Sequence, residues 1–165
     1  MDEIIECIPK LEGYNCFACG TANPIGLNLR FYRQGEYICS DITLEKNYEG
    51  WENMAHGGIV STLLDEVMSW TVIYFRRILF VTRRMQIKYI RPVPLYRLLT
   101  VKGKMLEGER RRLCKARGLI QDEDGNTLVR GEATFAVLSD KDLSLVPDNL
   151  RREMANLFKR FDRID

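Results

Sequence analysis

The segment 56–75 most constrains what this chain can fold into, because its apolar residues recur at helical spacing around most of the helix circumference. It begins HGGIVSTLLDEVMSW, and a helix with so little polar surface has to be enclosed by the rest of the protein. We therefore expect a long buried helix at about residues 57–75. Its apolar surface is formed by Ile59, Leu63, Leu64, Val67, Met68, Trp70 and Val72.

Alternating apolar and polar residues predict strands on both sides of this helix. The acidic segment 122–126 indicates a hairpin turn between the last two strands, and the prolines within 91–94 indicate a strand exit, because proline cannot donate to a central ladder. Residues 1–26 are expected to be irregular. The expected strands lie at 26–31 and 38–44 before the helix, and near 80–90, 98–107, 112–121 and 127–138 after it.

This order of elements predicts an α+β fold, in which an antiparallel sheet wraps around one long central helix. A length of 165 residues favours a single domain over 1–165, with its core at about 14–138. Residues 147–162 are polar, and we expect them to form a helical C-terminal tail.

The overall charge and the apolar runs exclude several classes of partner. A net charge of +2 is too small to argue for nucleic acid, and the arginine clusters fit either a solvated face or an anionic ligand such as phosphate. The acidic N-terminus differs from a signal peptide, and no uncharged apolar run reaches the ~18 residues of a membrane span. The five cysteines are an odd number with no framework spacing, and we therefore expect a cytoplasmic protein.

Two neighbouring acids, Asp65 and Glu66, interrupt the apolar run of the helix. They project about 100° apart, so they do not form a facing pair, and one can be functional while the other is structural. Burying an unpaired carboxylate costs several kcal/mol. Asp65 either bonds to Ser61 or to a neighbouring chain, or reaches solvent, or it has a functional role that justifies its position.

The start of the helix, His56-Gly57-Gly58, suggests such a role. Backbone N–H groups at a helix N-terminus can bind a carbonyl oxygen that acquires negative charge, and glycine lets a ligand approach closely. A tight turn with close packing explains the glycine pair equally well.

The spacing of these motifs resembles a known family. The HGG sequence is followed by Asp65 nine residues after the histidine, and Thr82 stands ten residues before Pro92. Together with CFACG at 16–20, NPIGL at 23–27 and YIRPVP at 89–94, the pattern is similar to that of the hotdog-fold acyl-CoA thioesterases. The resemblance covers roughly residues 14–138. It points to the phenylacetate-pathway branch of the 4-hydroxybenzoyl-CoA thioesterase superfamily.

The resemblance implies hydrolysis of an acyl-CoA thioester. Asp65 would act as general base or nucleophile, and the Gly57 amide would bind the thioester oxygen. His56 would orient the site, and Thr82 would position water or Asp65. Gly58 would bind substrate beside Gly57.

The resemblance also suggests contacts to the rest of the substrate. Some relatives carry an asparagine six residues before the histidine, where this chain has Gly50; the nearest amide side chain is Asn53, which we place in substrate binding. Arg91, or the run 110–112, would hold the phosphates of coenzyme A.

Helix geometry adds a requirement of its own. Gly57 and Asp65 are about 12 Å apart along a helix, too far to act on the same carbonyl group. If both act, they come from different chains. We therefore expect a homodimer with two composite sites, possibly assembled further into a homotetramer.

No metal or redox cofactor is expected, and coenzyme A enters only as part of the substrate. Cys16 and Cys19 form a single C-x-x-C pair, whereas a structural zinc site needs about four ligands. The strand–helix context of a thioredoxin-like redox pair is also missing. Packing cysteines are the simplest interpretation.

Two other functions fit the same fold. A non-catalytic acyl-CoA-binding or sensing protein is disfavoured by the acid at position 65. A hotdog dehydratase is disfavoured because the His–Asp arrangement of such enzymes is not evident.

Overall fold

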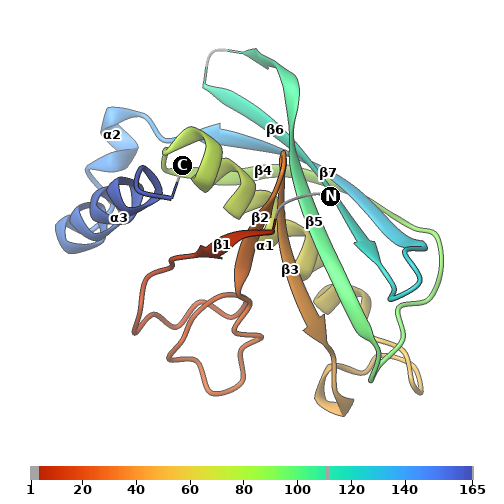
Figure 1. The fold of residues 1–165 in the computed structure, drawn as a ribbon. Coiled ribbons are helices and arrows are strands. Elements are labelled where there is room, and N and C mark those ends of the chain that lie inside the picture. The colour runs from red at the N-terminus through yellow and green to blue at the C-terminus, as the bar shows by residue number, and fades with distance from the viewer. Residues whose placement is uncertain (1–3, 111, 165) are drawn as a thin grey trace.

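The long helix α1 (Gly57–Arg76) lies against the inner face of a seven-stranded sheet that curves around it (Figure 1). The computed structural model describes residues 4–110 and 112–164. All strand pairs are antiparallel, in the order β1-β2-β3-β5-β6-β7-β4. The expected α+β fold, a sheet around one central helix, is confirmed. The strands are β1 (Ile4–Ile8), β2 (Phe31–Gln34), β3 (Tyr37–Thr43), β4 (Phe80–Tyr89), β5 (Leu98–Arg110), β6 (Leu113–Gln121) and β7 (Thr127–Val137).

The N-terminal region differs from expectation in two respects. Residues 4–8, expected to be irregular, form the edge strand β1, which pairs with β2. The strand expected at 26–31 begins only at Phe31, because the backbone before it is used elsewhere. The N–H groups of Leu27 and Leu29 donate to the carbonyls of Phe17 and Ala18, at 2.8 and 2.9 Å. This pairing fastens the CFACG segment to the body of the protein.

A row of glycines lets the sheet approach α1 closely. Gly103 pairs with Gly118, and Gly118 with Gly131, so the row crosses β5, β6 and β7. A Cβ atom on Gly103 would lie 2.3 Å from Thr71 Oγ1 and 2.8 Å from the Val67 carbonyl. The close packing of helix and sheet therefore depends on these positions having no side chain.

Helix α1 ends where the chain adopts a left-handed conformation at Arg77, whose φ is 52°. After β7 the chain forms the short helix α2 (Asp140–Leu143) and then α3 (Asp148–Phe161). The expected tail helix is thus observed, and its apolar side is buried: Leu157 and Phe161 are covered, and the Phe161 ring lies 5.2 Å from that of Tyr74. None of the helices in the described ranges is long and apolar enough to cross a membrane.

Candidate functional site

The N-terminus of α1 is capped by the single histidine of the chain. His56 has an extended backbone, and its Nδ1 accepts the Gly58 N–H at 2.9 Å. A Cβ atom on Gly58 would lie 3.0 Å from that nitrogen, so the glycine makes room for the cap. Of the two glycine amides, that of Gly58 is therefore used within the protein. The Gly57 N–H has no acceptor among the described residues, and Gly57 is exposed.

The carbonyl of Gly57 joins the helix start to the end of β4. It accepts hydrogen bonds from Ser61 Oγ at 2.8 Å and from the Tyr89 hydroxyl at 2.9 Å. The two hydroxyls also lie 2.8 Å apart. Tyr89 was recognised from the sequence only as part of the strand exit, and its role in fixing Gly57 could not be read from spacing.

A cavity of about 320 Å³ opens beside Gly57. It is formed where the loop before α1 meets the end of β4, and Arg91 lies in its wall, as does Gly57. Gly57 and Arg91, both expected to contact the acyl-CoA, therefore line the same cavity. The other lining residues are Trp51, Met54, Ala55, Val60, Tyr89, Ile90, Pro92 and Val93.

Asn53 lies outside this cavity. It adopts a left-handed conformation with φ of 62°, and its N–H donates to Glu49 Oε1 at 2.7 Å. Its backbone thus shapes the loop before α1. Of the alternative arginine run, residue 111 and the side chain of residue 110 lie outside the described residues, and Arg112 is exposed.

Two turns further along α1, Asp65 meets β4. The Thr82 hydroxyl donates to Asp65 Oδ1 at 2.9 Å, and the carboxylate is partly buried. Of the two tasks that the resemblance implies for Thr82, positioning water or Asp65, the second is compatible with this contact. The contact lies at the free edge of the sheet, since β4 is an edge strand.

A bulge in β4 makes this contact possible. Thr82 pairs with Phe135 and Arg84 pairs with Thr134, so Arg83 is an extra residue in the ladder. Side chains alternate along a strand, and the bulge shifts the alternation by one position. Thr82 and Tyr89 therefore both face α1 although they are seven residues apart. In a regular strand Val81 would share the inward face with Met85 and Ile87, but beyond the bulge it is 54% exposed.

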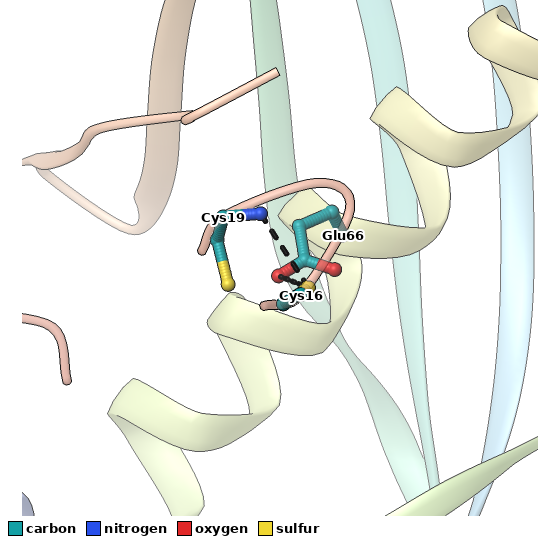
Figure 2. A group of neighbouring side chains, drawn as sticks. All are labelled: Cys16, Cys19 and Glu66. Carbon is teal, nitrogen blue, oxygen red and sulfur yellow. Dashed lines mark hydrogen bonds between the residues drawn. The ribbon is translucent and has the colours of Figure 1, made fainter. Parts of the chain in front are cut away.

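Glu66 has a different environment from Asp65. Its carboxylate accepts the Trp70 Nε1–H at 3.0 Å. It lies beside Cys16 and Cys19, 3.9 Å from Cys16 Sγ (Figure 2). Burial raises the pKa of Glu66 to about 7. A hydrogen bond from the Cys19 thiol, together with backbone N–H groups, lowers the pKa of Cys16 to about 5. The two adjacent acids thus serve two separate clusters, as their helical angle predicts.

Helix α1 is continuous from Gly57 to Arg76. The backbone positions of Gly57 and Asp65 are therefore about 12 Å apart along its axis, and the aspartate side chain leans back by only about 2 Å. Within one chain they do not converge on one small group.

The family description "Thioesterase superfamily" matches residues 52–129. Several solved structures share the fold. A thioesterase superfamily protein superposes with a TM-score of 0.69 at 25% identity, covering 74% of this chain and 60% of its own. This chain thus spans less than two thirds of that protein. No curated protein matches the sequence.

Two further structures cover more of their own length. A hypothetical thioesterase with coenzyme A from Streptococcus pneumoniae TIGR4 gives a TM-score of 0.61 at 22% identity, covering 68% of this chain and 90% of that one. A variant of the phenylacetic acid degradation protein PaaI from Thermus thermophilus gives 0.60 at 18% identity, covering 68% and 95%. These two likenesses concern the fold.

Proposed function

We propose that this chain, which has a hotdog fold and matches the thioesterase superfamily over residues 52–129, hydrolyses an acyl-CoA thioester to a free acid and coenzyme A. The observation that carries the proposal is the hydrogen bond of 2.9 Å from Thr82 to Asp65, which holds a partly buried carboxylate in place on a largely apolar helix. Desolvation of a carboxylate is costly, and this hydrogen bond offsets part of the cost.

Asp65 supplies the base or the nucleophile. As base, its carboxylate takes a proton from water, the water oxygen bonds to the thioester carbon, and the C–S bond breaks to release coenzyme A, which takes up the proton. As nucleophile, an Asp65 oxygen bonds to the thioester carbon while the C–S bond breaks and the thiolate of coenzyme A leaves. Water then hydrolyses the mixed anhydride to the free acid and the Asp65 carboxylate, and its proton passes to the thiolate. Thr82 donates to one carboxylate oxygen and leaves the other for either task.

The Gly57 N–H stabilises the oxyanion that forms on the thioester oxygen. It lies at the N-terminus of a 20-residue helix, where the backbone dipoles favour negative charge. His56 contributes by occupying the neighbouring Gly58 amide and fixing the first turn. Gly58 takes part in the site because its N–H bonds to His56 and its missing side chain leaves room for the imidazole.

Two chains are needed to bring these groups together. The edge strand β4 carries Val81 and Tyr89, which are 54% and 51% exposed in a single chain. Exposed apolar residues on an unpaired edge favour association with another strand. Pairing of β4 with its symmetry mate would place the Gly57 end of one helix near Asp65 of the other. We therefore propose a homodimer.

The bound coenzyme A of the Streptococcus pneumoniae structure supports a coenzyme A ester as the substrate class. In this chain the cavity beside Gly57 contains Arg91, whose guanidinium group suits a phosphate. No metal or redox cofactor takes part in the proposed hydrolysis.

Thiol release from a panel of acyl-CoAs tests the proposal. We expect Asp65→Asn to lower kcat by at least about a hundredfold, because the amide can neither accept a proton nor attack. Acyl-CoA binding, measured by calorimetry, should persist, since the amide keeps the size of the carboxylate and can still bond to Thr82. Asp41→Asn on β3 is the matched control and should leave turnover unchanged.

Two results would contradict the proposal. If Asp65→Asn releases thiol as fast as the unmodified protein, Asp65 is neither the base nor the nucleophile. Binding of acyl-CoAs without thiol release by the unmodified protein would instead indicate a non-catalytic binding protein on the same fold.

A further inference from the structure

The N-terminal segment meets α1 at a cluster that the proposed hydrolysis does not use. Cys16 and Cys19 come from the loop after β1, and Glu66 comes from the helix (Figure 2). Their two sulfurs and a carboxylate oxygen all lie within 4.8 Å of one another. From the sequence, the cysteine pair has no further ligand nearby; the fold supplies one from 47 residues beyond Cys19.

The loop holds the two sulfurs in a compact turn. The Cys19 N–H approaches Cys16 Sγ at 3.5 Å, and the Gly20 N–H donates to the Cys16 carbonyl at 2.9 Å. A Cβ atom on Gly20 would lie 2.4 Å from the Tyr14 carbonyl, so the turn requires glycine. Two cysteines separated by two residues supply paired thiolates in many zinc sites.

The carboxylate is also held in place. Trp70 Nε1 donates to Glu66 Oε1 at 3.0 Å, on the same face of α1 one turn later. Metal-ligating carboxylates are typically oriented by such a hydrogen bond from a neighbouring group.

Lys10, beside this loop, donates its hydrogen bonds to backbone and amide oxygens and not to the Glu66 carboxylate. Lys10 Nζ donates to the carbonyls of Cys19 and Leu29 at 2.8 and 2.7 Å, and to Asn28 Oδ1 at 2.8 Å. It ties the loop together through backbone and amide oxygens. If both thiols lose their protons beside the Glu66 carboxylate, Lys10 is not placed to pair with the resulting negative charge, and a bound cation would balance it.

We propose that Cys16, Cys19 and Glu66 bind one Zn²⁺ ion. Cys16 is exposed, so water can reach the fourth position of a tetrahedral site. Paired thiolates select zinc over magnesium or calcium, which prefer oxygen ligands alone. Binding displaces the thiol protons into solvent, and the ion links the N-terminal loop to α1.

Titration of the full chain with Co²⁺ tests this site. The protein is reduced, treated with a chelator and freed of it before Co²⁺ is added. We expect thiolate-to-cobalt charge-transfer absorption that saturates at about one equivalent per chain and is lost when Zn²⁺ is added. Zinc measured by elemental analysis should reach the same stoichiometry.

Variants identify the ligands. Cys16→Ser and Cys19→Ser should each abolish the charge-transfer band at one equivalent, and Glu66→Gln should weaken Co²⁺ binding by at least about tenfold. Cys7→Ser, which removes an exposed cysteine on β1, is the matched control and should bind like the unmodified protein. Circular dichroism shows whether each variant is folded.

Absence of the band in the reduced protein would overturn the proposal, as would unchanged binding in a folded Cys16→Ser Cys19→Ser variant. A Cys16–Cys19 disulfide in protein that binds no Co²⁺ after reduction would assign the pair to thiol oxidation instead. None of these results depends on turnover of acyl-CoA, so the zinc site and the proposed hydrolysis can fail independently.

Discussion

At the scale of single residues, the two glycines at the start of α1 have different tasks. Gly58 gives its N–H to His56, whereas the Gly57 N–H has no acceptor among the described residues. A Cβ atom on Gly57 would meet the Tyr89 hydroxyl only at 3.6 Å, an ordinary contact. The position can therefore accept a side chain, which allows its amide to be tested separately from its size.

Gly57→Pro removes this N–H without breaking the helix, because proline is favoured at the first helical position. The preceding His56 already has the extended backbone that a following proline requires. We expect kcat for thiol release to fall about a hundredfold or more, the effect of losing one oxyanion donor. Gly57→Ala keeps the amide and serves as the control. Equal losses in both variants would mean that bulk, and not the amide, is responsible.

At the scale of secondary-structure elements, the glycine row across β5, β6 and β7 determines how closely the sheet can approach α1. Gly103→Ala would place a methyl group against Thr71 and the backbone of Val67. We expect it to lower the free energy of unfolding by about 1–3 kcal/mol, because overpacking forces helix and sheet apart. Urea denaturation monitored by circular dichroism measures the change. Gly125→Ala in the hairpin turn provides a comparison in which positive φ, and not contact with α1, is the source of strain.

Local sequence patterns were sufficient to predict the central helix and most of the strands. The central helix, the hairpin at 122–126 and the strand exit at 91–94 follow from local patterns and are observed. The edge strand β1 was missed because its five residues, with Ile4 and Ile5 adjacent, show no regular alternation of apolar and polar side chains. The outward position of Val81 was not predictable, because alternation alone does not reveal the bulge at Arg83.

The candidate site was predictable to a similar extent. The helix start at His56-Gly57-Gly58 was predicted from the residues themselves. The family resemblance, and not the spacing, suggested that Thr82 positions water or Asp65. The third member of the cysteine cluster, Glu66, could not be, because only the fold brings α1 against the loop that contains Cys16. Tyr89 was missed for the same reason, since its partner Gly57 lies 32 residues away.

At the scale of the whole molecule, the 12 Å between Gly57 and Asp65 makes the proposed enzyme dependent on its dimer. Mixing inactive Gly57→Pro and Asp65→Asn proteins tests this directly. With random subunit exchange, half of the dimers are mixed and each has one intact site, so activity should recover to about a quarter of the unmodified level. Exchange is verified with differently tagged chains. No recovery despite proven exchange would place both groups in a site within one chain.

The bulge at Arg83 shows how little chain is needed to change what a strand presents to its surroundings. One inserted residue exchanges the inward and outward positions of all side chains on one side of it. At the start of β4, the Thr82 hydroxyl therefore points inward and the Val81 side chain points outward. The same bulge thus provides the Thr82 hydroxyl that holds Asp65 and the exposed apolar side chain of Val81 on the sheet edge. Removing that one residue would undo both at once, without altering any side chain that performs chemistry.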